Sequence, residues 1–190
     1  MSLVKKFKAE NGVSLVELIV SVGLFSIVML SAAGIFKAVV DGQRSAISAQ
    51  NVQENIRYAL EKISKEIRMA QISNTDCLPA GVNKVFNTAA GLTELHFKNQ
   101  YGDCVTYYLD SNSNRLNINV ATGISAGTYY ITPAKIEASN LKFFVEDDLI
   151  GSFHSTQPYV TMVMEVRAVG LAIHEQKMKI QMKVSSRYYE

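Results

Sequence analysis

Catalytic signatures are missing from this chain of 190 residues. It contains no G-x-S-x-G, G-x-G-x-x-G, P-loop or kinase-type motif. Its three histidines are far apart and lack the spacing of metal ligands, whether HExxH or any other: His96, His154 and His174. The sequence therefore predicts no enzyme, no cofactor and no metal centre, and its length allows one domain with a core but hardly two.

An excess of charge of one sign is also missing. The formal net charge is +2, from 19 basic and 17 acidic residues, which is too small to indicate a nucleic-acid partner. A nucleic-acid-binding patch would have to be local. The candidate is the basic C-terminal strand face of Lys177, Lys179, Lys183 and Arg187, with Tyr188 beyond, which could contact DNA phosphates or stack on a base. The alternative is an ordinary solubilising face.

Cysteine is scarce. Cys77 and Cys104 fit no metal-ligand spacing and no C-x-x-C redox motif, so a single disulfide and two free thiols both remain open. Export of the domain would favour the disulfide. Closing that loop would stabilise the domain by roughly 3–4 kcal/mol in the chain-entropy model.

Proline is absent before Pro79, so nothing forbids one nearly continuous helix over 13–72, with Gly34 and Asp41-Gly42 as its soft points. Residues 13–40 are apolar except for Glu17 and Lys37. The uncharged part, 18–36, is long enough as a helix to cross the ~30 Å hydrocarbon core. The lysines that precede it should stay cytoplasmic, which places everything after Asp41 outside.

A cleaved secretory signal would carry a small-residue cleavage site after its apolar run, and none is obvious here. Glu17 is the unusual residue of the run, because a carboxylate at a membrane centre costs about 2.5–3.5 kcal/mol on insertion scales. It either needs a partner or is tolerated in the first helical turn, where the helix dipole favours an acid by about 0.3–1 kcal/mol.

The order Gly12-Val13-Ser14-Leu15-Val16-Glu17 resembles the prepilin processing motif of type IV pilin-like proteins. The resemblance implies that a prepilin peptidase removes the leader, residues 1–12, after Gly12, and that the new amine of Val13 is methylated. Glycine before the scissile bond would let an extended backbone lie close to the protease. Glu17 of a neighbouring subunit would be the countercharge of that amine, so that both can be buried. The family usually has Phe or Met at the position of Val13.

An amphipathic helix is predicted over 41–72, because apolar residues recur at three- and four-residue steps. Its opposite face carries alternating charges that can pair weakly, as Arg57 and Glu61 can. The tract 53–71 is similar to the equivalent helix of J-type pseudopilins and W-type minor pilins. The apolar positions of this helix are Val52, Ile56, Ala59, Leu60, Ile63, Ile67 and Ala70.

Residues 73–190 are predicted to form a β-rich exported head. Strands are expected at 93–98, 105–109, 115–120, 128–131, 141–146, 159–169 and 177–188, and the last two alternate most clearly. One antiparallel sheet with an apolar face, packed on the helix, accounts for both patterns. The fold class is thus α+β and pilin-like. Some pilin relatives hold calcium in loops, so Asp147 and Asp148 could form a calcium site; the alternative is that these acids are only solvated. Asp103 and Asp110 also lie in predicted loops or at strand ends.

The resemblance implies a structural subunit, a minor pilin or pseudopilin of a type IV pilus or type II secretion-like filament, which primes assembly or caps the tip. Its expected partners are other pilins or pseudopilins, the prepilin peptidase, the inner-membrane assembly platform and, before assembly, membrane lipid. Its expected location is the bacterial cytoplasmic membrane, with the N-terminus inside, and then the filament. The alternatives are a membrane-anchored extracytoplasmic binding domain, in which Gly12 and Glu17 are coincidental, and a component of a pilus for DNA uptake or adhesion.

Overall fold

The computed structural model describes residues 12–89, 91–147, 149–150, 153–154, 156–169 and 177–187. The chain divides into two compact units, of which the first ends at Gln43 and the second begins at Arg44. Most of the predicted leader, together with Asp148, His174 and Tyr188, lies outside the described residues.

One helix, α1 (Leu15–Arg68), runs through 54 residues without interruption. Gly34 and Asp41-Gly42 do not break it, and it ends four residues before the predicted boundary. Glu17 in its first turn and the basic Lys65 and Arg68 in its last turn complement the helix dipole. The chain then leaves the helix direction and forms an isolated antiparallel bridge between Gln71 and Lys98.

The head contains two main antiparallel sheets and a short hairpin, so the prediction of a single sheet was wrong. Five strands follow one another as a meander: β1 (Phe86–Thr88), β2 (Glu94–Lys98), β3 (Cys104–Asp110), β4 (Arg115–Val120) and β5 (Gly127–Tyr130). The second sheet has the order β10 (Lys177–Ser185), β9 (Tyr159–Ala168), β6 (Ile136–Glu146), and the hairpin joins β7 (Leu149–Ile150) to β8 (Phe153–His154).

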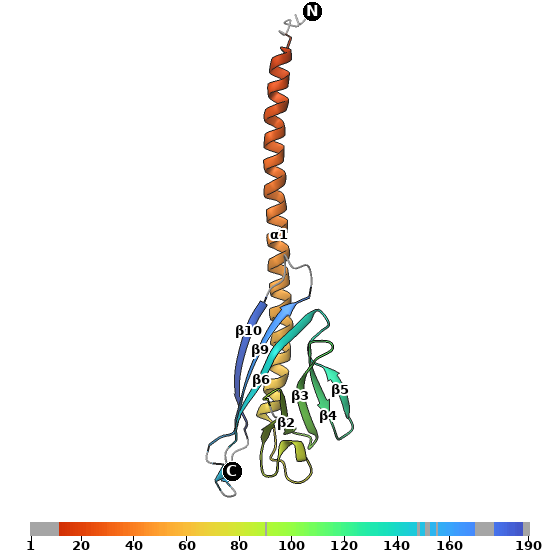
Figure 1. Ribbon diagram of the computed structural model, residues 1–190, viewed down its shortest axis with the longest axis vertical. Coiled ribbons are helices and arrows are strands. Elements are labelled where there is room, and N and C mark those ends of the chain that lie inside the picture. The colour runs from red at the N-terminus through yellow and green to blue at the C-terminus, as the bar shows by residue number, and fades with distance from the viewer. Residues whose placement is uncertain are drawn as a thin grey trace, which may run out of the picture. The chain divides into compact units, whose positions relative to one another are not determined.

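The split arises at β6, which meets the meander through few backbone hydrogen bonds rather than a ladder. The amide N–H groups of Ala138 and Phe143 donate to the carbonyl oxygens of Asn114 and Leu92, at 2.7 Å each. The register of β6 against β9 also shifts between Ser139 and Lys142. Such a bulge increases the local twist of a strand. The two sheets therefore lie against each other at this strand instead of merging (Figure 1).

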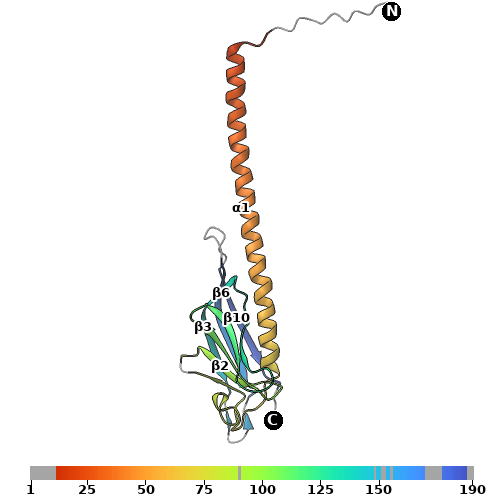
Figure 2. The same cartoon turned by 90° about the vertical axis from the view of Figure 1, so that its right-hand side faces the viewer.

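Both sheets share one core with the part of α1 that follows Arg44. The helix buries a stripe of five residues at three- and four-residue spacing, which confirms the amphipathic pattern: Val52, Ile56, Ala59, Ile63 and Ile67. The meander contributes Phe86, Phe97 and Tyr107, whose rings contact in sequence, and the second sheet contributes Phe143, Met162 and Met164. Figures 1 and 2 show β10 and β6 running beside this part of the helix.

Candidate functional site

The candidate site begins at Gly12, directly before α1. A Cβ atom added at Gly12 would meet no atom within 4 Å, and its backbone needs no positive φ angle. Neither packing nor conformation in the described structure therefore requires a glycine at this position. Any requirement for glycine at this position would therefore have to come from a second molecule that approaches the backbone.

Glu17 lies in the first turn of α1, four residues after Val13, which precedes the helix. The earliest hydrogen bond of this turn runs from the amide N–H of Leu18 to the carbonyl oxygen of Ser14, at 3.1 Å. Val13 and Glu17 are both exposed. The start of the chain after Gly12 and the carboxylate of Glu17 are therefore close together in sequence, and no described residue buries either of them. This arrangement presents a carboxylate and, after a cut behind Gly12, an amine to neighbouring molecules.

The first part of α1 is long and apolar enough, by length and composition, to cross a membrane. No residue of its most apolar 18-residue window is buried. The hydroxyl groups of Ser21, Ser26 and Ser31 each donate to the carbonyl oxygen four residues earlier, at 2.7–2.9 Å. Their polarity is thus satisfied within the helix, as a lipid environment demands. Such an exposed apolar surface has to be covered by lipid or by other apolar helices.

The two cysteines lie together at the start of the head. The structure joins Cys77 and Cys104 by a disulfide, with their Cα atoms 5.5 Å apart. Both are buried, in a small cluster with Ala80. The bond connects the segment after α1 to the first residue of β3.

The predicted basic face lies on the exposed side of β10. Lys177, Lys179 and Lys183 alternate with inward-facing residues, but the face is not purely cationic. The Nζ atom of Lys179 lies 3.1 Å from a carboxylate oxygen of Glu165, and this contact lowers the pKa of Glu165. The Nζ atom of Lys183 lies 3.6 Å from the ring centroid of Tyr159. Arg187 lies beyond the strand, where its backbone N–H donates to the carbonyl oxygen of Arg68.

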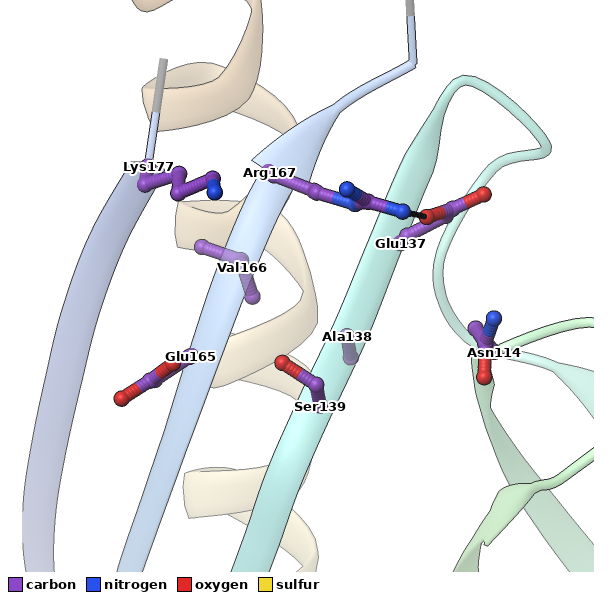
Figure 3. Close-up of a pocket in the computed structure, with 8 residues that line it drawn as sticks. All are labelled: Asn114, Glu137, Ala138, Ser139, Glu165, Val166, Arg167 and Lys177. Atoms are coloured by element: carbon purple, nitrogen blue, oxygen red, sulfur yellow. Dashed lines mark hydrogen bonds and ion pairs between the residues drawn. The ribbon is translucent and has the colours of Figure 1, made fainter. Parts of the chain in front are cut away.

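A small cavity of about 180 Å³ lies at the upper end of this sheet (Figure 3). Glu137 and Arg167 form an ion pair across its wall, with Nε of the arginine 2.7 Å from the carboxylate. Glu165 and Lys177 also line it, so its walls carry two acids and two bases. This balance selects neither an anion nor a cation.

Three aspartates predicted to lie in loops or at strand ends take part in the hydrogen bonding of the head. Asp147 Oδ2 accepts hydrogen bonds from the amides of Val85 and Phe86, at 2.7 and 2.9 Å, and so fixes the start of β1. Asp103 lies in the turn before β3 and Asp110 accepts hydrogen bonds from the turn after it. Among the described residues, no group of three or more His, Cys, Asp or Glu could hold a metal ion.

Sequence reasoning missed two polar contacts that link distant elements. The first is the anchoring of β1 by Asp147, and the second is the hydrogen bond from the Tyr107 hydroxyl to Glu66, at 2.6 Å. Burial is the main cause that raises the pKa of Tyr107. Both join residues more than 40 positions apart, for which a single sequence carries no signal.

Comparison with known proteins gives one match, at the N-terminus. Residues 7–33 match the model of the prokaryotic N-terminal methylation motif. Neither the curated proteins nor the solved structures contain a significant match to this chain. The matched region includes Gly12, Val13 and Glu17 together with most of the uncharged helical segment. This chain therefore carries the N-terminal methylation motif of type IV pilin leaders, on a long apolar helix that continues into an α+β head.

Proposed function

We propose that the chain is a structural subunit, a minor pilin or pseudopilin, of a type IV pilus or a type II secretion-like filament. One observation carries the proposal: the methylation motif at 7–33 leads directly into a helix of membrane-spanning length whose apolar window is not buried. A filament core built from such helices would supply the missing apolar cover.

In this proposal the prepilin peptidase cuts after Gly12, and the amine released on Val13 is methylated. The helix holds the subunit in the cytoplasmic membrane, with lipid as its first partner, until the assembly platform transfers it to the filament. There the amine of Val13 pairs with Glu17 of a neighbouring subunit. Two charges that would each be costly alone can then enter the apolar bundle together.

The head has no assigned ligand in this proposal, and its place is at the tip of the filament, where it primes assembly or caps the shaft. The low copy number that follows is supported by two features of the sequence. Val13 stands where shaft subunits usually carry Phe, and α1 has no proline. Quantification of subunits in sheared filaments tests this, and a stoichiometry near that of the main subunit would contradict it.

The decisive experiment is the N-terminal mass of the membrane-extracted chain, expressed with and without a prepilin peptidase. We expect a chain that begins at Val13 only when the peptidase is present. Gly12→Leu should abolish the cut. Gly42→Leu is the matched control, because a Cβ at either glycine meets no atom within 4 Å, and it should be processed normally. An uncut chain under all conditions would instead favour a membrane-anchored binding domain.

A further inference from the structure

The second sheet of the head ends in a long strand with one open side. β10 has nine residues and pairs with β9 in unbroken register, from Lys177 opposite Arg167 to Ser185 opposite Tyr159. Within the described part of the chain, no strand pairs with its other side. Every second residue of such an edge directs both its backbone N–H and its C=O outward, where an additional strand can pair with them.

The other sheet edges differ from this one. The outer side of β6 is covered by backbone bonds to Leu92 and Asn114. The outer strands of the meander, β1 and β5, have three and four residues. β10 is therefore the longest described strand whose edge is uncovered, and it contains neither a proline nor a register shift that would interrupt a new ladder.

A groove of about 550 Å³ runs along this edge, between β10 and α1. Its floor includes Met178, Ile180 and Met182, which are only half-buried. Their partners across the ladder in β9 are at most 2% exposed. The apolar face of the sheet is therefore fully buried at β9 but only partly buried at β10. Methionine side chains adapt readily to a partner's shape.

The helix supplies the opposite wall of the groove. Ile56 and Leu60 extend the apolar floor, and Arg57, Glu61 and Ser64 form a polar rim. An apolar floor beside an open strand edge is the arrangement that accepts an extended peptide by strand addition, with the backbone giving affinity and alternate side chains entering the groove.

The lysines of β10 restrict which strand can add. Lys177, Lys179 and Lys183 alternate along the exposed side, so a second β10 paired antiparallel would place lysines near lysines. Lysines protect edges against self-association in this way. Protection alone does not explain the half-buried floor of the groove. An incoming strand with acidic side chains on its exposed side and apolar ones on the other would pair with the lysines and cover the floor of the groove.

We propose that the β10 edge and the groove beside it receive an extended segment of another filament subunit, in which apolar residues alternate with acidic ones. The segment adds as a fourth strand to the sheet, its apolar residues cover Met178, Ile180 and Met182, and its carboxylates face the lysines. The identity of the occupant as a filament subunit rests on the proposed function; the binding chemistry does not.

Fluorescence anisotropy of a labelled nine-residue peptide that alternates glutamate and valine, titrated with the full chain in detergent micelles, tests the proposal. We expect saturable binding. The same peptide with lysine in place of glutamate should bind at least tenfold more weakly. A third peptide, N-methylated at alternate backbone amides along the pairing edge, should lose binding, because it cannot complete the ladder.

Charge reversal in the protein provides the matched control. Lys179→Glu with Lys183→Glu should exchange the preference, so that the lysine peptide binds more tightly than the glutamate peptide. Lys62→Glu with Lys65→Glu makes the same change of charge on α1, outside the groove, and should leave the preference unchanged.

Three results would overturn the proposal. They are absence of binding by the glutamate peptide, equal binding of the N-methylated peptide, and self-association of the chain through β10, seen as cross-linking of a Gln181→Cys variant to itself. The peptide measurement does not depend on leader processing. A chain that is never cut but binds the glutamate peptide would therefore refute the pilin proposal and leave the strand-addition site standing.

Discussion

Glu17 is the charged residue on which assembly should depend most directly. It lies in the first turn of an otherwise apolar helical segment and has no apolar cover of its own. If its carboxylate pairs with the amine of a neighbouring Val13, Glu17→Gln leaves that amine buried without its countercharge. We expect leader cleavage to be unaffected and incorporation into filaments to fall at least tenfold. Immunoblots of sheared filaments and of membranes measure the two quantities, and normal incorporation would contradict the pairing.

His96 should make the stability of the head depend on pH. Its Nδ1 atom lies 2.9 Å from the Thr106 hydroxyl, and burial lowers its pKa more than the nearby Glu94 raises it. The folded state therefore binds a proton less readily than the unfolded chain does. Stability should be full above the ordinary histidine pKa of about 6.5 and should fall as the pH drops below it.

Thermal unfolding of the full chain in micelles between pH 7.5 and pH 5 measures this dependence. The window avoids carboxylates such as Asp76, whose pKa is lowered by the hydrogen bond from Lys98 and whose contribution is lost at more acidic pH. We expect His96→Gln to unfold at a temperature that changes less over this range than that of the parent chain. An equal change in both proteins would show that other groups cause the dependence.

At the scale of the element, the buried stripe of α1 should contribute most of the stability that the helix gives to the head. Ile63 is 0% exposed, whereas Ile47, on the same helix, is 58% exposed. Ile63→Ala should destabilise the head by about 2–5 kcal/mol, because it removes buried methyl groups and leaves a cavity. Ile47→Ala should stay within about 0.5 kcal/mol. Urea unfolding followed by circular dichroism compares them, and similar losses would contradict the packing of the stripe.

The helices and strands differ in how well the sequence predicts them. The three- and four-residue steps from Val52 to Ile67 and the alternation over 159–169 are local patterns, so both elements were predicted within a few residues. β6 was predicted only from 141 because Asn140 interrupts the alternation, at the bulge where it takes a φ of 53°. The three residues of β1 are too few to show a period. The division into two sheets depends on pairing between distant segments.

The residues at the start of α1 were predictable from the sequence, whereas the groove beside β10 was not. Gly12, Val13 and Glu17 lie within six consecutive residues, so order and spacing alone were enough to single them out. The groove beside β10 was not predictable, since alternation marks Met178, Ile180 and Met182 as core residues like those of β9. The fold is what shows that no further strand completes their burial among the described residues.

At the scale of the whole molecule, the chain combines two units that require different surroundings. The first, which ends at Gln43, exposes apolar side chains along its helix, and the second, from Arg44, has a closed core of its own. Lipid or neighbouring helices suit the first unit, and an aqueous compartment suits the second. The positive residues before the helix predict that this compartment is outside the cytoplasm.

The Cys77–Cys104 disulfide connects that topology to a measurable redox state. Disulfides persist in exported proteins and are rare in the cytosol. If the head is exported, we expect both cysteines of the chain isolated from cells to resist maleimide until a reductant is added. Charge reversal of the leader lysines, Lys5, Lys6 and Lys8, should impair export and leave a fraction of the chain labelled without reduction. The control is the same reversal at Lys62 and Lys65, which lie after the helix segment of membrane length.

The bond should also stabilise the exported form. Its two cysteines are 27 positions apart, and closing a loop of this length contributes about 3–4 kcal/mol in the chain-entropy model. The Cys77→Ala, Cys104→Ala double variant should therefore lose about that much free energy of unfolding relative to the oxidised chain. A reductant should weaken the parent chain and leave the double variant unchanged. If both thiols of the parent chain are labelled before reduction, the head lies in a reducing compartment. That result would contradict the extracytoplasmic orientation that a filament subunit requires.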